Sequence, residues 1–145
     1  MLLRNILHRK GGMVYTVRPD AALQDVLYRL VHHRIGALVV TSNGEQDGEV
    51  QGIITERDIL RTCASGHWPL SALRVSDFMT KELIIGSPDD PIEEAMRLMT
   101  EKRIRHLPVL SEGRLVGMVS IGDVVKAQHD LLAVENRFMK DYIRG

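Results

Sequence analysis

Residues 117–123 read GMVSIGD, and residues 52–58, GIITERD, are a near copy of them earlier in the chain. Each copy consists of a glycine, a short apolar run, a hydroxyl residue and, three positions later, an aspartate. The apolar run is typical of a buried strand, and a hydroxyl residue followed by an acidic one is typical of a helix start. The hydroxyl residues, Thr55 and Ser120, are 65 positions apart, and the aspartates have the same spacing, so we predict two copies of one unit.

The repeat continues upstream with a slightly different offset. The offset falls from 69 to 65 because the first copy has a longer turn, residues 42–52, than the second, residues 111–117. A surface loop accepts such a length difference at little cost. Six pairs of similar residues lie 69 positions apart: Pro19 and Pro88, Leu23 and Ile92, Asp25 and Glu94, Leu30 and Met99, Arg34 and Arg103, and Ile35 and Ile104.

Hydrophobic periodicity predicts the element order β-α-β-β-α in both copies, and therefore an α/β (α+β) fold. In the first copy we expect strands at 13–17, 37–40 and 50–55, and helices over 21–33 and from Asp58. In the second copy we expect strands at 83–85, 106–110 and 115–120, and helices over 88–102 and from Asp123. The domain limits that follow are an N-terminal amphipathic turn over 1–12, a first repeat over 13–64, a connector over 65–80, a second repeat over 81–130 and a C-terminal helix extension over 131–145.

Two apolar helix faces lie outside the repeated elements. Near the N-terminus, Leu3, Ile6 and Leu7 share one face, and the two glycines that follow residue 10 are expected to end that turn. In the last helix the apolar residues are spaced alternately three and four apart, namely Val124, Ala127, Leu131, Val134 and Phe138. This stripe is longer than one repeat needs, so we expect it to pack on the partner repeat or on a second chain.

The composition excludes several function classes. With 44% apolar and 26% charged residues, the chain of 145 residues is typical of one compact domain, or of two small repeats that share a core. Its 19 basic and 19 acidic residues cancel, so neither nucleic acid nor a membrane surface is expected as a partner. No segment approaches the ~20 apolar residues that span a bilayer.

Cys63 is the single cysteine of the chain. An internal disulfide is therefore impossible, and a reducing, cytoplasmic location is expected. Cys63 and His67 form only one Cys-x-x-x-His pair, and the adjacent His32 and His33 point apart on a helix, so no metal site is expected.

The hydroxyl-x-x-Asp pattern has two interpretations. In one copy alone it is most simply a strand end followed by a helix N-cap. Two copies favour a second interpretation, a ligand-binding site. Pseudo-twofold packing of the repeats would bring both strand-to-helix junctions to clefts at one interface. A carboxylate there accepts two hydrogen bonds from a ribose diol, and each bond to a charged group contributes roughly 1.5–3 kcal/mol.

Residues 13–130 resemble a CBS domain pair, the Bateman module named after cystathionine beta-synthase, in both matched motifs and in the ordered pairs upstream. The resemblance implies that the repeats pack through their sheets with pseudo-twofold symmetry, and that adenosine-containing ligands lie in two clefts between them. It implies a first cleft formed by Ile53, Thr55, Arg57, Asp58, Ile84, Arg105 and His106. It implies a second cleft formed by Met118, Ser120, Asp123, Tyr15, Gly36 and Ala37. Apolar side chains and backbone amides would hold the adenine, and the aspartate would hold the ribose.

The two expected clefts differ in charge. The second copy has Gly122 in place of Arg57, and the first copy has a Gly-Ala pair in place of Arg105 and His106. Because arginine forks suit phosphate oxygens, the first cleft is predicted to be the better phosphate site. The structural alternatives are a solvated helix end for the arginines and a hydrogen-bonded core histidine. Four basic side chains gather at the first cleft, namely Arg57, Arg103, Arg105 and His106.

We therefore expect a free-standing, non-catalytic sensor, because the repeats and their flanks use up the chain and no nucleophile with a base and oxyanion donors is recognisable. The expected ligand is AMP, ADP or ATP, with NAD or NADH as a further candidate and S-adenosylmethionine left open. Binding would shift the angle between the repeats and within a homodimer, to which an unknown downstream protein responds. The alternatives are a nucleotide-free dimerisation scaffold that uses the C-terminal stripe, and a nucleotide-processing enzyme with Arg57 and His106 as catalytic groups.

Overall fold

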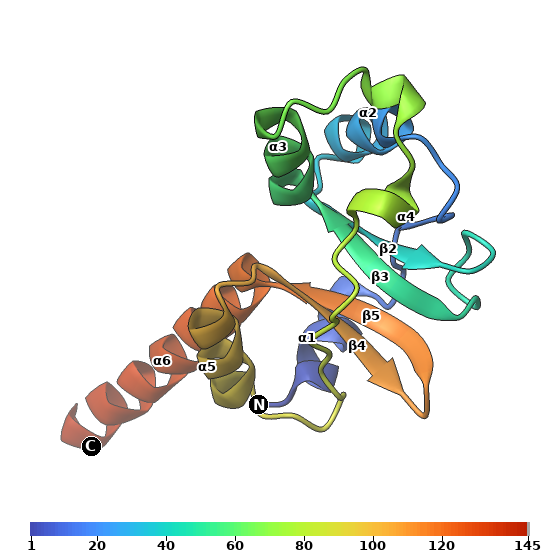
Figure 1. Ribbon diagram of the computed structural model, residues 1–145. Helices are drawn as coiled ribbons and strands as arrows, with labels where there is room; N and C mark the ends of the chain where they lie inside the picture. Colours follow the sequence, from blue (N-terminus) through green and yellow to red (C-terminus); the bar gives the residue numbers. More distant parts are fainter. Residues whose placement is uncertain (145) are drawn as a thin grey trace.

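The computed structural model, which describes residues 1–144, places the first repeat above the second in the view of Figure 1. Strand β1 runs parallel to β2, and β2 runs antiparallel to β3, which gives one three-stranded sheet. Strand β1 covers only the end of the strand predicted over 13–17. The elements of the first repeat are β1 (Thr16–Val17), α2 (Leu23–His33), β2 (Ala37–Thr41), β3 (Val50–Thr55) and α3 (Glu56–Ala64).

The second repeat has the same order of helices and paired strands. Its strands β4 and β5 form an antiparallel ribbon. The mixed α/β class and the two tandem repeats predicted from the sequence are confirmed. A connector with a 3-10 turn (Leu70–Ala72) and α4 (Val75–Phe78) leads into α5 (Ile92–Lys102), β4 (His106–Ser111), β5 (Arg114–Ser120) and α6 (Ile121–Arg144).

The prediction of a strand at residues 83–85 is wrong. Only the neighbouring Gly86 pairs with β4, through an isolated parallel bridge to Val109. The residues that follow pair with the N-terminus instead, where the Leu3 N–H donates to the Asp90 carbonyl over 2.9 Å. Two prolines in this segment lack an N–H, so they cannot continue a strand ladder.

Helix α1 (Leu3–Lys10) packs on the second repeat although it precedes the first repeat in the sequence (Figure 1). Its two buried side chains, Leu3 and Ile6, belong to the core of the second repeat. Leu7 of α1 packs directly over Gly117 of β5, where a Cβ would force the Leu7 side chain to move. The N-terminal segment therefore crosses over to the other repeat.

A shared apolar cluster joins the two sheets. Its buried members are Val14, Val39 and Leu115, which come from the segment before β1, from β2 and from β5. Partly buried side chains from β3, β4 and β5 pack against them. The repeats therefore pack through their sheets, as the resemblance implied.

Gln46, in the longer turn of the first repeat, forms hydrogen bonds at the contact between the two repeats. Its Oε1 accepts from the Val14 N–H over 2.9 Å. Its Nε2 donates to the carbonyls of Gly12 and Leu115, over 2.7 and 3.0 Å. The additional turn residues thus bind backbone groups from both sides of the contact between the repeats.

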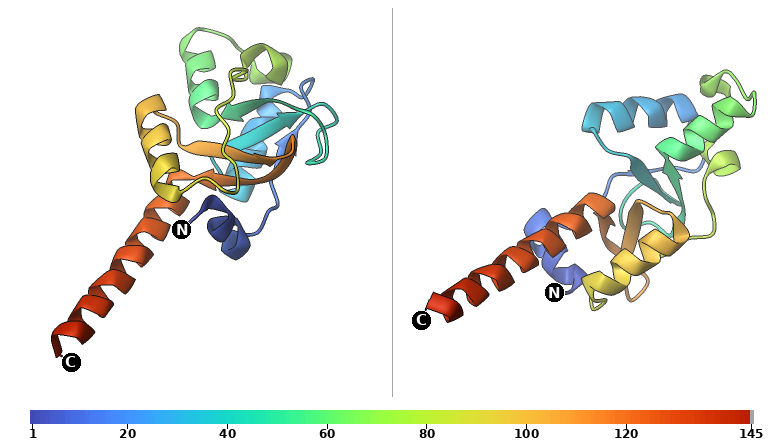
Figure 2. Two further views of the ribbon diagram at one scale, coloured as in Figure 1. Left: turned by 90° about the horizontal axis from the view of Figure 1, so that it is seen from below. Right: turned by 90° about the vertical axis from the view of Figure 1, so that its left-hand side faces the viewer.

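Helix α6 extends away from the rest of the molecule in every view (Figures 1 and 2). Val124 and Ala127 are buried against the second repeat, whereas Val134 and Phe138 are 56% and 73% exposed. Packing of the whole stripe on the partner repeat is therefore wrong, and packing on a second chain stays a prediction. Within residues 1–144, no helix combines the length and apolar character needed to cross a membrane.

Candidate functional site

The first strand-to-helix junction is a reciprocal capping box between Thr55 and Asp58. The backbone N–H and the Oγ1 hydroxyl of Thr55 donate to Asp58 Oδ2 over 2.9 and 3.1 Å. In return Thr55 Oγ1 accepts from the Asp58 N–H over 3.2 Å. Thr55 is the N-cap of α3, so these bonds satisfy N–H groups that a helix start leaves unpaired.

The other oxygen of Asp58 is held by the connector. Thr80 Oγ1 donates to Asp58 Oδ1 over 3.0 Å. Thr80 is positioned by two backbone hydrogen bonds to Ile53, of 3.0 and 2.8 Å, which add it to the edge of β3. Asp58 is only 7% exposed, so little of its carboxylate is open to a ligand hydroxyl in this arrangement.

The second junction repeats the box with a charged third partner. The Ser120 N–H donates to Asp123 Oδ2 over 2.9 Å, and Ser120 Oγ accepts from the Asp123 N–H over 3.1 Å. Lys10 Nζ donates to Asp123 Oδ2 over 2.6 Å and to the Met118 carbonyl over 2.9 Å. Burial acts to raise the pKa of Asp123, but the hydrogen bonds from Lys10 and the Ser120 backbone outweigh it and hold that pKa below its ordinary value.

Lys10 was missed by sequence reasoning. It is the last residue of α1, and Gly11 ends that helix with a φ of 96°, which glycine accommodates without strain. Lys10 and Asp123 are 113 positions apart, so no local pattern relates them. One signal was available, since the offset of 69 places Thr80 opposite Gly11, directly beside Lys10.

His106 and Gly36 meet between the two junctions. A Cβ built on Gly36 would lie 2.8 Å from His106 Cε1 and 3.2 Å from Glu56 Oε1. The residue expected in the first cleft therefore touches one expected in the second. Burial lowers the pKa of His106, the carboxylate of Glu56 opposes this, and the charges of Lys10 and Arg105 lower the pKa further.

The basic residues of the first cleft are linked across the repeats. Arg57 Nη1 donates to the Arg103 carbonyl over 3.1 Å. Arg103 ends α5 in the left-handed conformation, with a φ of 54°, and Arg34 ends α2 in the same way. The side chains of Arg57, Arg103 and Arg105 are exposed, so they are available to an anion in solution.

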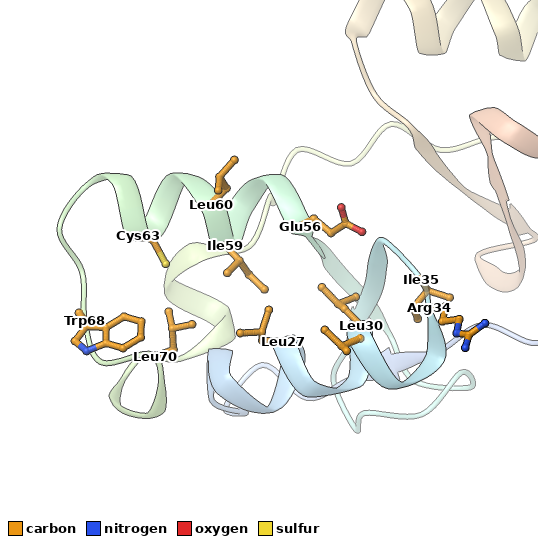
Figure 3. Close-up of a pocket in the computed structure, with 11 residues that line it drawn as sticks. Leu27, Leu30, Arg34, Ile35, Glu56, Ile59, Leu60, Cys63, Trp68 and Leu70 are labelled. Carbon is orange, nitrogen blue, oxygen red and sulfur yellow. The ribbon is translucent and has the colours of Figure 1, made fainter.

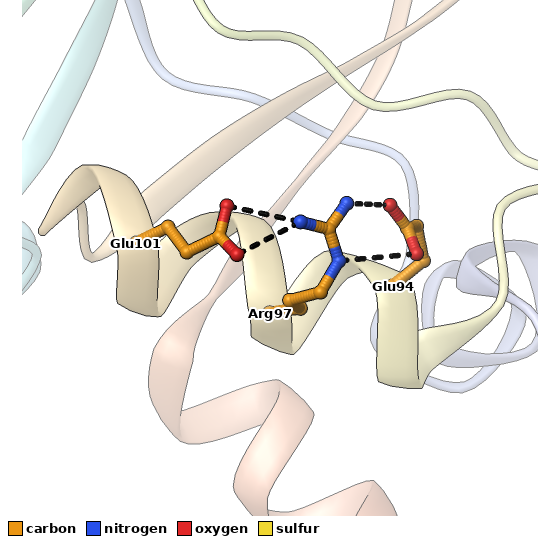
Figure 4. A network of polar contacts seen from close by, with 3 residues as sticks. All are labelled: Glu94, Arg97 and Glu101. Atoms are coloured by element: carbon orange, nitrogen blue, oxygen red, sulfur yellow. Dashed lines mark hydrogen bonds and ion pairs between the residues drawn. The ribbon is translucent and has the colours of Figure 1, made fainter.

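Arg97 on α5 differs from these arginines because its charge is already paired (Figure 4). Its Nη1 donates to both carboxylate oxygens of Glu101 over 2.9 Å, and its other nitrogens bond Glu94. The hydrogen bond from Arg97 lowers the pKa of Glu94. Arg97 therefore serves its own helix and not a ligand site.

The family model for the CBS domain matches this chain twice, over residues 12–65 and 75–130. The chain belongs to the CBS domain family. Its two junctions are thus the equivalent junctions of the two repeats of a CBS pair.

Known proteins resemble this CBS pair over most of its length. It is 41% identical over 128 residues to the CBS domain-containing protein CBSX3, mitochondrial, of Arabidopsis thaliana. The aligned region covers 87% of this chain and 62% of that protein. It thus spans less than two thirds of that relative. The crystal structure of the CBS-domain containing protein ATU1752 from Agrobacterium tumefaciens is 41% identical, with a TM-score of 0.81 over 88% of this chain and 92% of the other.

A more distant CBS pair, of protein MJ0100, was crystallised with 5′-methylthioadenosine and S-adenosyl-L-methionine. It has a TM-score of 0.71 over 88% of this chain and 98% of the other, at 22% sequence identity. This likeness shows that the two proteins share the fold.

The remaining expected site residues of the CBS pair lie in different surroundings. The Tyr15 ring stacks on His33 of α2, with ring centroids 4.0 Å apart. Ala37 is fully buried at the start of β2, and Ile84 packs on the core of the second repeat. Met118 offers its carbonyl to Lys10, while its side chain packs on the cluster between the sheets.

An open apolar groove of about 540 Å³ lies between α2 and α3 of the first repeat, and Glu56, which directly follows Thr55 of the first junction, also lines it (Figure 3). Val31, Leu60 and Trp68 beside it are 70%, 71% and 72% exposed. Trp68 stands at one end of the groove and Arg34 at the other. Among the side chains that the structure describes, no group of three His, Cys, Asp or Glu is placed to hold a metal ion.

Proposed function

We propose that this CBS pair is a regulatory module whose two clefts bind adenine nucleotides. The observation that carries the proposal is the pair of hydroxyl–aspartate boxes, because each carboxylate also meets the segment that precedes the other repeat. A carboxylate fixed in this way by N–H groups is suited to accept the hydroxyls of a ribose. A ligand there contacts both repeats at once.

In the first cleft, the adenine lies against Ile53 and Ile84, and the ribose replaces the Thr80 hydroxyl on Asp58. Thr55 contacts the sugar or phosphate. The exposed side chains of Arg57 and Arg105 supply the positive charge for the phosphates, and the partly buried His106 supplies a hydrogen-bond donor.

In the second cleft, Asp123 holds the ribose and Ser120 orients that carboxylate. Tyr15, Gly36 and Met118 provide the adenine surface, whereas Ala37, which was also expected there, is fully buried at the start of β2.

The ligands we propose are AMP, ADP and ATP, with NAD or NADH as the alternative. The contact of Gly36 with His106 supports the dinucleotide, since it brings residues of the two clefts together. The complex of MJ0100 with two adenosine compounds supports the same ligand class for the fold.

The proposed role is regulation without catalysis, by population shift. The two repeats can be arranged at different angles, and a nucleotide that bridges them binds one arrangement more tightly than the other. Binding therefore favours that angle, and a partner protein responds to it. We keep the cytoplasm as the proposed compartment because Cys63 is an exposed free thiol. Fractionation of the source cells tests this, since the Arabidopsis relative is named mitochondrial.

A second copy of the chain is the proposed occupant of the groove between α2 and α3. The exposed apolar side chains of Val31, Leu60 and Trp68 support this, because burying them stabilises an interface. The hexameric CBS-CP12 protein of bloom-forming cyanobacteria, 28% identical with a TM-score of 0.73, shows a relative that self-assembles. We expect Val31→Glu to give a monomer in analytical ultracentrifugation, whereas Val134→Glu on α6 leaves the dimer intact. The opposite pattern would assign the interface to the α6 stripe, which is the alternative that the sequence predicted.

Calorimetric titration with AMP, ATP and NAD tests the ligand proposal. Arg57→Met should weaken binding of the phosphorylated ligand about tenfold, since a charge-assisted hydrogen bond is lost. Arg97→Met is the matched control, because that arginine is exposed and paired on its own helix. Equal affinities for wild type and Arg57→Met would remove Arg57 from the site.

The groove also favours a second function, a nucleotide-free dimerisation scaffold. Mass spectrometry of the small molecules released on denaturing the purified protein separates the two. Release of an adenine nucleotide supports the sensor. A dimer that releases nothing and shows no thermal shift with AMP, ATP, NAD or S-adenosylmethionine supports the scaffold.

A further inference from the structure

The second junction contains a cation that the sequence did not reveal. Lys10 Nζ lies 2.6 Å from Asp123 Oδ2, the oxygen that also accepts from the Ser120 N–H. The same ammonium donates to the Met118 carbonyl over 2.9 Å. Lys10 therefore contacts two residues of the expected second cleft.

The ammonium is held at this place by the packing of α1. Leu3 and Ile6 anchor the helix in the core of the second repeat, and Leu7 lies against Gly117. A Cβ at Gly12 would lie 2.7 Å from the Val116 carbonyl, so the chain also approaches β5 closely just beyond Lys10. The lysine is thus presented by a fixed backbone and not by a free terminus.

A ribose that binds Asp123 competes with this ion pair. The Lys10 and Asp123 side chains are 40% and 27% exposed, so the pair is partly shielded from water. A neutral nucleoside would bind the Asp123 carboxylate and offer the Lys10 ammonium no negative charge in its place. A ligand with a phosphate near its ribose would replace the lost carboxylate contact with a new charged one.

Other basic side chains near Lys10 also favour a negatively charged ligand. Lys10 and Arg105 both lie close enough to His106 for their charges to add to burial in lowering its pKa, against the opposing carboxylates of Glu56 and Asp123, so Arg105, and not the imidazole, is a second cation near Lys10. A cavity of about 160 Å³ between α1 and α6 adjoins the pair, and Arg9, Lys126 and the acidic Asp130 also line it. Arg9 is itself paired with Asp130 at 3.5 Å, which leaves Lys10 as the cation that faces the Asp123 carboxylate directly.

We propose that Lys10 makes the second cleft selective for adenosine ligands that carry a phosphate beside the ribose, over neutral adenosine. This inference rests on the proposed function and deepens it. It also adds to the second cleft a cation that the two repeat motifs do not contain, because Lys10 comes from the segment before the first repeat.

An NMR titration with AMP and with adenosine tests the proposal separately for each cleft. The Ser120 and Thr55 amides report on the second and first cleft, because each N–H donates to the aspartate of its own junction. In the wild type, AMP should shift the Ser120 amide at a concentration at least about tenfold lower than adenosine. In Lys10→Met this ratio should fall about fivefold, both because AMP binds more weakly and because adenosine no longer breaks an ion pair.

Lys126→Met is the matched control, since Lys126 lines the same cavity on α6. An unchanged ratio at Ser120 in Lys10→Met, or the same fall in Lys126→Met, would overturn the inference. AMP that shifts Thr55 and not Ser120 would overturn it while the proposed function stands. If AMP shifts neither amide, the proposed nucleotide function fails for AMP and the inference fails with it.

Discussion

The two strand-to-helix junctions of this CBS pair have the same local chemistry and different surroundings. Asp58 and Asp123 both accept from the backbone of the hydroxyl residue three positions earlier. Each also meets a side chain that comes from the segment before the other repeat, and that side chain is neutral Thr80 in one case and charged Lys10 in the other. The repeat motif thus determines the helix cap, whereas the flanking segments determine the charge beside the carboxylate and its accessibility.

The largest expected effect is a difference in stability between variants of the two aspartates. Asp58→Ala should lower the free energy of unfolding by about 2 kcal/mol, because it removes a capping box and leaves the Thr55 N–H and the Thr80 hydroxyl without their acceptor. Asp123→Ala should cost about 1 kcal/mol, because water replaces the lost acceptor at this more exposed junction. Urea unfolding measures both values. Equal losses would mean that the difference in burial has no energetic consequence.

A smaller effect is expected where the repeats touch. Gly36→Ala should cost about 1 kcal/mol, because the new Cβ would lie 2.8 Å from His106 Cε1 and force that ring to move. The equivalent residue of the second repeat is Arg105, and Arg105→Ala should change stability by less than about 0.5 kcal/mol. Adding His106→Ala to Gly36→Ala should recover part of the loss in a double-mutant cycle. Additive losses would show that the ring does not oppose the methyl group.

The smallest effect concerns acid stability. The pKa of Asp123 is lowered in the folded protein, so its charged form stabilises the fold above the ordinary value of about 3.9, and this contribution is lost as pH falls through the folded value. Lys10→Met should raise the folded pKa and reduce this acid-side loss by roughly a few tenths of a kcal/mol, since the pair is partly exposed. Urea unfolding between about pH 5 and pH 2 measures the change, with Lys126→Met as control. Identical pH profiles for wild type and Lys10→Met would contradict the ion pair.

The sequence predicted the repeat order and the two helix starts because both follow from local patterns. Hydroxyl-x-x-Asp satisfies the first N–H groups of a helix wherever it occurs after a strand. The partners of the two carboxylates were not predictable in this way, since Thr80 lies 22 positions from Asp58 and Lys10 lies 113 positions from Asp123. The expected strand at 83–85 is not formed, because only Gly86 pairs with β4, and the apolar run alone does not reveal that these residues lack a ladder partner.

Gln46 gives the assembly of the repeats an internal reporter of folding. Its side chain bonds Gly12 and Val14 within the first repeat and the Leu115 carbonyl of the second repeat, so the bond to Leu115 exists only after the first hairpin has docked against the second repeat. Hydrogen exchange of the Gln46 side-chain amide, which donates to Leu115, should therefore follow the docking step, whereas exchange at Val14 also depends on the fold of the first repeat. The longer turn of the first repeat would then contribute to the step in which the two repeats become one cooperative folding unit.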